Sequence, residues 1–126
     1  TSLLAILQAH ANQLLESVKE KESVIDRVKV LITSNAGHRV VNTESIAQHL
    51  NMSVRNLHRV LQENGTSYQS IRDQTLLDIG KEALAETKTS VTDIALQLGY
   101  SESSAFVRMF KRNVGITPLQ YRKQAR

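Results

Sequence analysis

The chain has 126 residues, of which 40% are hydrophobic, enough for one packed core or for two very small domains that share one. It contains no cysteine, which excludes disulfides and cysteine-ligated metals and fits a cytoplasmic protein. We expect neither a signal peptide nor a membrane span, which needs roughly 18 consecutive apolar residues. The net charge of +4 permits a nucleic-acid partner.

The positive charge is concentrated toward the C-terminus. Residues 100 to 126 hold six Lys or Arg and only Glu102 as an acid, whereas residues 43 to 99 hold five basic and seven acidic residues. A basic segment attracts phosphates and raises association rates, although an ordinary solvated tail would have the same composition. Charge alone leaves both interpretations open.

An amphipathic helix is predicted over residues 3 to 20. Its apolar side chains follow a spacing of three and four residues: Leu4, Leu7, Ala11, Leu14 and Val18, with Leu3 and Leu15 at the edges. The stripe covers about two and a half heptads, shorter than a dimerising coiled coil requires. We therefore expect this helix to pack on its own domain.

A second helix is predicted to begin after Ser23, which forms a capping-box pattern with Asp26. The sequence Asn35-Ala36-Gly37 is typical of a helix C-terminus. The stripe between these ends consists of Ile25, Val28, Lys29, Leu31 and Ile32. Residues 38 to 41 are expected to form a short connection.

A repeat organises the rest of the chain. The pattern Ile46-Ala47-x-x-Leu50-x-x-Ser53 returns 48 positions later as Ile94-Ala95-x-x-Leu98-x-x-Ser101. Each copy predicts a short helix, a turn of about three or four residues, and a second helix capped by Ser53 or by Ser101. This is the helix-turn-helix layout, in which the second helix can enter a DNA major groove.

The short first helix of each copy also has a predicted start. Thr43 is expected to cap the first of them. Ser90 and Asp93 form a capping-box pattern before its counterpart. Both copies should therefore begin with a short capped helix.

A long helix from Ser67 to about Thr87 is predicted to join the two copies. Its inward-facing residues are Ile71, Leu76, Ile79, Ala83 and Leu84. Gly80 in the middle costs about 1 kcal/mol relative to alanine, which predicts a close approach of another helix there. With a last helix that starts at Thr117-Pro118, we expect about nine helices and no sheet, an all-α fold.

The second helix of each copy carries an apolar and a polar face. Leu57 and Leu61 in one copy, like Phe106 and Phe110 in the other, are four residues apart and should be buried together. Other residues of these helices point elsewhere, and they include Arg, Asn and Gln. Arginine can bond a guanine edge and asparagine or glutamine an adenine edge, so these polar faces suit the reading of duplex DNA.

The two copies resemble a known family. The stretch Ile94-Ala95-x-x-Leu98-Gly99-Tyr100-Ser101-x-x-Ser104-x-Phe106-x-Arg108-x-Phe110-Lys111-x-x-x-Gly115-x-Thr117-Pro118-x-x-Tyr121-Arg122 is similar to the signature of the AraC/XylS family of bacterial transcription regulators. The stretch Ser53-x-x-x-Leu57-x-Arg59-x-Leu61-x-Glu63-x-Gly65-Thr66-Ser67-Tyr68 resembles the first helix-turn-helix of the same family. Together the two stretches cover about residues 43 to 124.

The resemblance implies sequence-specific binding of double-stranded DNA, with two recognition helices in successive major-groove segments about 34 Å apart. It implies a regulator such as an activator that works with RNA polymerase and needs no cofactor, although the sequence does not distinguish activation from repression. Members usually carry a separate effector or dimerisation domain, for which this chain is too short. We therefore expect a C-terminal piece of a longer regulator.

The expected subdivision follows the two copies and the helix between them. An N-terminal helical segment covers residues 1–37 and the first helix-turn-helix subdomain covers 38–66. The connecting helix covers residues 67–88, and the second helix-turn-helix subdomain covers 89–126.

The resemblance also assigns residues to the DNA interface. Base contacts are expected at Asn56, His58, Arg59, Ser103, Ser104 and Arg108, with Arg55 on the same polar face. Phosphate contacts are expected at Thr43, Ser53, Gln62, Ser101, Lys111, Arg112 and Arg122. Ala105 departs from many relatives, which have a polar or larger residue, so contact there is limited to a thymine methyl. Arg59 and Arg108 have a structural alternative, which is to bond neighbouring carbonyls or to pair with Glu63 or Asp93.

Other functions fit the sequence less well. A helical interaction module could dock a partner helix through the Leu4–Val18 stripe, but it would leave an apolar rather than a polar outer groove. Catalysis is not expected, because His10, His38, His49 and His58 lack metal-ligand spacing and no catalytic triad or Gly-rich phosphate loop is present. RNA binding lacks stacking residues, since Tyr100, Phe106 and Phe110 should be buried.

Overall fold

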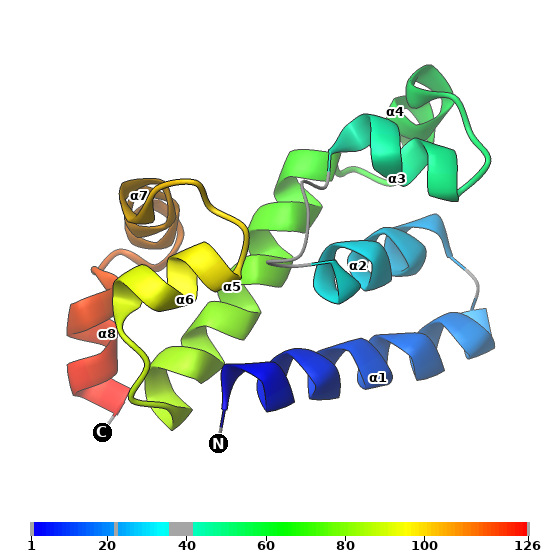
Figure 1. The fold of residues 1–126 in the computed structure, drawn as a ribbon. Coiled ribbons are helices and arrows are strands. Elements are labelled where there is room, and N and C mark those ends of the chain that lie inside the picture. Colours follow the sequence, from blue (N-terminus) through cyan, green and yellow to red (C-terminus); the bar gives the residue numbers. More distant parts are fainter. Residues whose placement is uncertain (1, 22, 36–41, 126) are drawn as a thin grey trace.

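The computed structural model describes residues 2–21, 23–35 and 42–125, with side chains described outside residues 14–21. Within these ranges the chain forms eight α-helices and no strand, which confirms the all-α class. They are α1 (Leu3–Lys21), α2 (Val24–Ser34), α3 (Thr43–His49), α4 (Val54–Glu63), α5 (Tyr68–Glu86), α6 (Val91–Gln97), α7 (Ser103–Val114) and α8 (Pro118–Ala125) (Figure 1). The described ranges thus hold eight helices, where about nine were expected for the chain.

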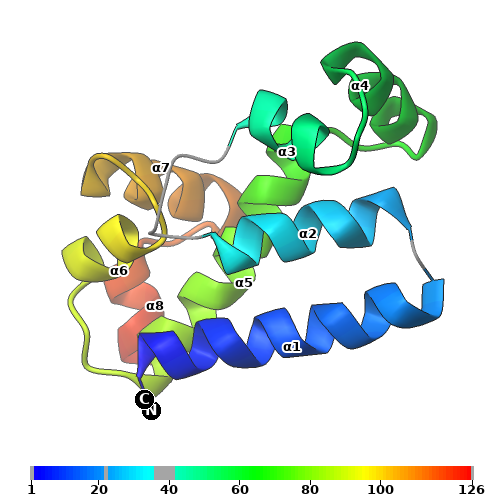
Figure 2. The ribbon, with the colours of Figure 1, turned by 45° about the vertical axis from the view of Figure 1, so that its right-hand side comes forward.

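The helix α5 runs through the middle of the fold (Figures 1 and 2). It packs against α1, α2, α6 and α8. Its predicted inward-facing residues are all buried: Ile71, Leu76, Ile79, Ala83 and Leu84. A Cβ added to Gly80 would lie 3.1 Å from both Cε1 and Cζ of Phe106 on α7. The close approach predicted at Gly80 is therefore made by an aromatic ring rather than by the backbone of another helix.

The apolar stripe of α1 is displaced from its predicted position. Leu3 and Ile6 are buried, whereas Leu4 is 67% exposed, and Leu7 and Ala11 are half-buried. The prediction was wrong at Leu4 because the face that meets α2 and α5 passes through residues 3, 6 and 7. The rest of the predicted stripe lies outside the described side chains: Leu14, Leu15 and Val18.

A polar contact adds to the packing of α1 on α5. Nε2 of His10 lies 3.1 Å from Oε1 of Glu82. With Leu3 and Ile6 buried in the same core, the described part of α1 packs on its own domain, as predicted.

None of the helices in the described ranges combines the length and the apolar character that crossing a bilayer requires.

Most of the predicted helix starts are confirmed. The hydroxyl oxygens of Ser23, Ser53, Ser67 and Ser90 each accept a hydrogen bond from the backbone N–H three residues later. Such bonds satisfy one of the N–H groups that a helix start leaves without a partner. The capping residues therefore fixed where α2, α4, α5 and α6 begin.

The predicted cap of α3 was wrong by one residue. Asn42 is the cap, and its Oδ1 accepts a hydrogen bond from the Ser45 backbone N–H at 2.8 Å. The Ser45 hydroxyl in turn accepts from the Asn42 backbone N–H at 3.1 Å. This reciprocal pair leaves Thr43 as the first residue inside the helix.

The predicted cap of α7 was also wrong. The helix begins at Ser103 after Glu102, which makes no side-chain capping bond, and Ser101 stays in the preceding turn. The cause is an extra residue in this turn: Leu57 and Phe106 are 49 positions apart, whereas the first helices repeat after 48.

The helix ends agree with the predicted signals where the chain is described. Asn35 follows α2, and its predicted companions Ala36 and Gly37 and the connection at 38–41 lie outside the described residues. Gly115 ends α7 with a φ of 92°, a conformation that glycine adopts without strain. Thr117 and Gln120 bond each other's backbone N–H groups at the start of α8, at 3.1 and 2.9 Å.

Candidate nucleic-acid interface

The first unit (α3 and α4) and the second unit (α6 and α7) share one backbone motif. In the first, the Met52 N–H donates to the Ala47 carbonyl at 2.9 Å, and in the second the Tyr100 N–H donates to the Ala95 carbonyl at 3.1 Å. These bonds close the end of each short helix in the same way and set the direction of the helix that follows. The repeat in the sequence is therefore a repeat of helix-turn-helix geometry.

Each second helix is anchored by a fully buried face. Leu57 and Leu61 on α4, like Phe106 and Phe110 on α7, have no exposed surface, as predicted. Fully burying a side chain of this size stabilises the fold by about 1.5–3 kcal/mol. The opposite face of each helix is consequently held toward solvent with little freedom to rotate.

The outward face of α4 brings together the predicted base-contacting residues of the first unit. Arg55, His58, Arg59 and Gln62 are exposed, and Asn56 is half-buried. They line one shallow hollow together with Ser53 and Val54. This face offers hydrogen-bond donors and acceptors of the kinds that read base edges.

Arg59 is paired within its own helix in the free protein. Its Nη1 lies 2.6 Å from Oε1 of Glu63, and its Nη2 donates to Oδ1 of Asn56 at 2.6 Å. The structural alternative considered for Arg59 is thus present, but both ionic partners are about 60% exposed. An exposed pair one helical turn apart contributes about 0.3–0.5 kcal/mol, so a nucleic-acid partner can displace it.

The outward face of α7 carries fewer polar groups and more charge. Ser104, Arg108 and Lys111 are exposed, while Ser103 and Val107 are half-buried. Among the described residues Arg108 has no hydrogen-bond or ion-pair partner, and Asp93 is not paired with it. Its guanidinium therefore points to solvent without a competing contact.

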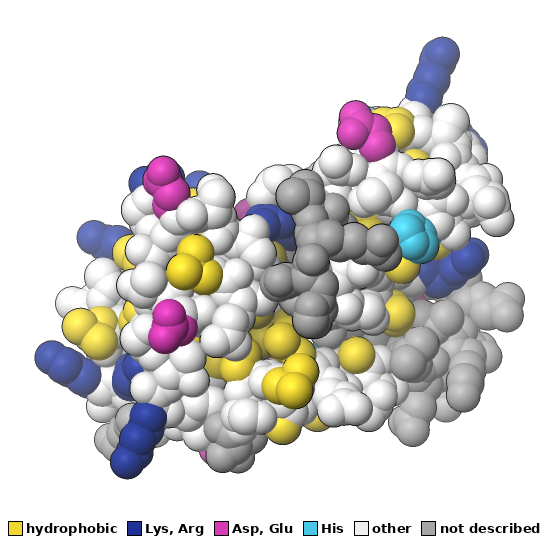
Figure 3. All heavy atoms as spheres, in the orientation of Figure 1, with side chains coloured by type: hydrophobic (Ala, Val, Ile, Leu, Met, Phe, Trp, Pro, Cys, Tyr) yellow, Lys and Arg dark blue, Asp and Glu magenta, His cyan; other side chains and the backbone are white. Residues whose placement is uncertain are grey.

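The last turn of α7 holds two cations, Lys111 and Arg112. Positive charges are favourable near the negative end of the helix dipole, and here they also follow Arg108 on the same helix. On the face shown in Figure 3, Lys and Arg side chains lie mainly at the margins, over α4 at one end and over α7 and α8 at the other.

Arg122, a predicted phosphate contact, bonds to backbone carbonyls in the free domain. Its Nε donates to the Leu84 carbonyl at 3.0 Å, and its Nη2 donates to the carbonyls of Thr87 and Thr89 at 3.3 and 2.5 Å. The side chain is half-buried and joins α8 to the end of α5. These bonds give Arg122 a structural role in the free domain.

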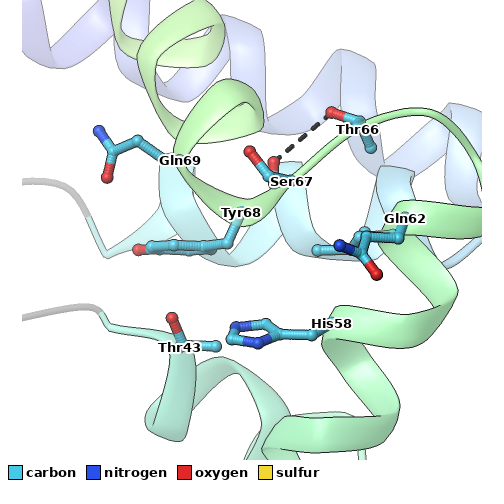
Figure 4. Close-up of a pocket in the computed structure, with 8 residues that line it drawn as sticks. Thr43, His58, Gln62, Thr66, Ser67, Tyr68 and Gln69 are labelled. Carbon is cyan, nitrogen blue, oxygen red and sulfur yellow. Dashed lines mark hydrogen bonds between the residues drawn. The ribbon is translucent and has the colours of Figure 1, made fainter.

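A pocket of about 310 Å³ lies where α4 meets the start of α5 (Figure 4). Three predicted residues, Thr43, His58 and Gln62, line it, and the ring of Tyr68 lies across from His58 and Thr43. The rest of the lining comes from Leu61, Thr66, Ser67 and Gln69. Burial raises the pKa of the Tyr68 hydroxyl, and the positive charge of Arg72 acts in the opposite direction.

The sequence interpretation missed Tyr68 and Gln69 as part of this surface. A signal was available, because the Gly65-Thr66-Ser67 turn directly follows the recognition helix. Gly65 has a φ of 72°, and the Thr66 N–H donates to the Leu61 carbonyl at 3.0 Å. That turn brings the first residues of α5 back alongside α4.

Comparison with known proteins identifies the domain. A family model described as a helix-turn-helix domain matches residues 46–124. The chain is 33% identical over 110 residues to the ornithine utilization regulator of Pseudomonas aeruginosa, a match that covers 87% of this chain and 32% of that protein. It spans about a third of the length of the curated relatives it matches.

Solved structures share the fold. A DNA-binding transcriptional dual regulator from Escherichia coli superposes with a TM-score of 0.75 at 26% identity, over 82% of this chain and 92% of that one. A transcriptional regulator from Chromobacterium violaceum with an AraC-type DNA-binding domain has the same fold, with a TM-score of 0.73 at 24% identity over 85% of this chain and 96% of that one. The paired helix-turn-helix units and these matches confirm the resemblance found in the sequence: the chain belongs to the AraC/XylS family of helix-turn-helix, DNA-binding transcription regulators.

Proposed function

We propose that this domain binds double-stranded DNA sequence-specifically and controls transcription initiation, with α4 and α7 in two successive major-groove segments. Family membership supports DNA binding and a regulatory role. The two-groove arrangement is the more specific part of the proposal, and it predicts recognition helices centred about 34 Å apart along the duplex.

One observation carries the proposal: each second helix fully buries its pair of large apolar side chains and turns a polar, cationic face to solvent. Both lie on the side of the molecule away from α1, with α5 between them (Figures 1 and 2). A module that docked a partner helix would need an apolar outer groove instead. These faces therefore favour a polyanionic partner over an apolar one.

Within this proposal the two kinds of contact fall to different residues. Arg108 is the strongest base reader of α7, because arginine can bond the O6 and N7 of guanine together. Lys111 and Arg112 contact phosphates, which position the protein without reading sequence. On α4, base contacts come from Arg55, Asn56, His58 and Arg59, and on α7 Ser103 and Ser104 add further base contacts. Other phosphate contacts come from Thr43, Ser53, Gln62 and Ser101.

The parent regulator is also part of the proposal. The relatives include an HTH-type transcriptional activator, and they are about three times as long as the matched segment. We infer that this domain works in the cytoplasm beside an effector or dimerisation domain and meets RNA polymerase at the promoter. No catalytic role is proposed.

The test is selection of bound duplexes from a random pool, followed by footprinting of the enriched sequence. The expected result is one motif with two half-sites whose centres are about 10–10.5 base pairs apart, protected on one face of the duplex. Enrichment of no motif would contradict sequence-specific binding. Enrichment of a single half-site would contradict the use of both recognition helices.

A further inference from the structure

Four side chains connect α5 to the second unit, and we name this cluster the α5–α7 brace: Arg72, Asp73, Tyr100 and Arg112. Cζ of Arg72 lies 4.9 Å from the centroid of the Tyr100 ring. Oδ2 of Asp73 lies 3.6 Å from Nη2 of Arg112, and its Oδ1 lies 3.9 Å from Nη1 of Arg72. One carboxylate thus lies between two cations that belong to different helices.

The part of the brace on α5 is better shielded from water than an ordinary surface ion pair. The side chain of Asp73 is 16% exposed and that of Arg72 is 23% exposed, while Tyr100 is buried; the side chain of Arg112, on α7, is 68% exposed. Nε2 of Gln69 donates to Oδ1 of Asp73 at 2.8 Å and fixes the carboxylate on the surface of α5. Shielding of Asp73, Arg72 and Tyr100 strengthens the contacts among these three side chains.

The brace joins α7 to α5 at a different place from Phe106, whose ring lies against Gly80. At 1.5 Å per residue these two contacts are about 9 Å apart along α7, from Phe106 to Arg112, and about 10 Å apart along α5, from Asp73 to Gly80. Two separated contacts restrain the angle of α7 to α5 more than either contact alone.

The position of the brace on α5 connects it to the first unit. Arg72 and Asp73 lie about one turn after Tyr68, where α5 begins. Tyr68 follows directly on the turn that ends α4, and it lines a pocket with His58 of α4. The brace therefore attaches the second recognition helix to the part of α5 that is nearest to the first.

We propose that Asp73 is a positioning residue: through the α5–α7 brace it sets the angle of α7, and with it the half-site spacing that the two recognition helices accept. This inference rests on the proposed function. A change of one base pair moves a half-site by about 3.4 Å and rotates it around the duplex, so a domain with a fixed angle discriminates between spacings. Arg112 can hold Asp73 and a phosphate together, because a guanidinium has five N–H donors.

The chain offers a closely matched control for Asp73→Asn. Asp78 lies on the same helix and accepts a hydrogen bond from Nε2 of Gln74 at 2.9 Å, just as Asp73 accepts one from Gln69. It forms no ion pair within the described residues. Asp78→Asn therefore removes the same charge beside the same kind of local bond, and it disturbs no ion pair to α7.

The experiment measures Kd on the selected operator and on versions with one base pair added or removed between the half-sites. We expect the unmodified domain to prefer its own spacing by at least about 10-fold, and Asp73→Asn to lose at least about 3-fold of that preference. Asp78→Asn should keep the original spacing profile. If Asp73→Asn weakens binding to all spacings equally, its spacing profile stays parallel to that of the unmodified domain and the inference is overturned.

Two further results keep the test decisive. If the Tm of Asp73→Asn lies far below that of Asp78→Asn, the spacing experiment is repeated with Arg72→Lys. This substitution keeps the positive charge but removes the planar guanidinium that stacks on Tyr100. The same flattened profile is expected from it, and an unchanged profile contradicts the inference. A selection that yields no operator would refute the proposed function, whereas a selected operator with an unaltered profile refutes only the role of the brace.

Discussion

The turn of the first unit and the turn of the second are closed by equivalent backbone hydrogen bonds, yet different residues occupy the left-handed position. Asn51 has a φ of 55° in the first turn, and Gly99 has a φ of 98° in the second. Asparagine is one of the few residues besides glycine that tolerates this conformation. The motif is thus defined by backbone geometry, and two sequences satisfy it by different means.

The cores of the two units differ more than their turns. The first is packed with aliphatic side chains such as Leu57 and Leu61, whereas the second is built on a chain of rings. Centroids of Tyr100 and Phe106, Phe106 and Phe110, and Phe110 and Tyr121 lie 5.6, 5.8 and 5.5 Å apart. Aromatic pairs at such distances contribute about 0.5–1.5 kcal/mol beyond the area they bury.

The outward faces also divide the work unequally. At positions 49 residues apart, Asn56 and His58 of α4 correspond to Ala105 and Val107 of α7, and Gln62 corresponds to Lys111. The face of α4 is therefore richer in hydrogen-bonding groups and that of α7 in net charge. Under the proposed function, this difference favours base reading by α4 and phosphate attachment by α7.

The largest effect tests the difference between the cores. Phe106→Ala should reduce the free energy of unfolding by about 3–5 kcal/mol, because it opens a cavity beside Gly80 and removes two ring contacts. Leu57→Ala in the first unit should cost about 2–5 kcal/mol. Urea denaturation measures both. A smaller loss for Phe106→Ala than for Leu57→Ala would show that the rings do not hold the second unit more firmly.

The next effect compares the two recognition arginines. Arg108→Ala should weaken binding to the selected operator by about 1–3 kcal/mol and relax preference at one base pair. Arg59→Ala should cost less, because Arg59 gives up its bonds to Glu63 and Asn56 before it contacts DNA. Titrations on operator and random duplexes distinguish the roles, and equal losses on both duplexes would show that Arg108 is not a base reader.

Phosphate attachment is tested at the matched pair Lys111 and Gln62. Lys111→Ala should weaken binding to all sequences alike and reduce the slope of log K against log salt by about one. Gln62→Ala should leave that slope unchanged, since it removes no charge. The measurement is affinity at several salt concentrations. A sequence-dependent loss for Lys111→Ala would reverse the assigned roles.

A smaller effect follows from the ion pair of the first unit. Glu63→Gln should tighten DNA binding by about 2- to 5-fold, because it releases Arg59 and removes a negative charge from the face of α4. Glu86→Gln, an exposed acid at the other end of α5, serves as the control. Equal gains in the two variants would mean that net charge, and not the release of Arg59, is responsible.

The smallest effect is the pH dependence of stability that comes from Tyr68, at the start of α5, and Tyr100, in the second unit. Burial raises the pKa of Tyr68 and of Tyr100 above the ordinary value of 10.0, with Arg72 opposing the shift in both. The folded state therefore keeps protons that the unfolded state releases, and stability should fall as the pH rises above about 10. Chemical denaturation at alkaline pH measures the fall, and Tyr100→Phe should reduce it. A stability that is independent of pH in this range would contradict the shifts.

The fold was largely predictable because capping serines and buried pairs four residues apart leave strong marks in the sequence. Ser53 and Ser90 marked helix starts, and Leu57 and Phe106 marked buried faces, all of which are confirmed. The prediction that Ser101 caps α7 was wrong, because the capping position depends on local backbone geometry. One additional residue in the turn places Glu102 at that position. Repeats in sequence therefore fix the motif more reliably than its exact boundaries.

Contacts between distant segments could not be predicted in the same way. Leu4 matched the helical spacing as well as Ile6 does, and only the placement of α2 and α5 decides which of them is buried. Arg122 looked like another cation of the basic segment, and its bonds to carbonyls 33 to 38 residues away depend on tertiary structure. The α5–α7 brace could not be predicted either, because it joins residues that are far apart in the sequence.

The bonds made by Arg122 have a consequence for synthesis of the chain. The last carbonyls of a helix lack partners within it, and at the end of α5 those of Leu84 and Thr87 are satisfied by a residue translated 38 and 35 positions later. While the ribosome is still making α6 and α7, the final turn of α5 lacks these donors. The second unit should therefore complete its folding late, when α8 emerges, whereas the first can form as soon as α5 is available.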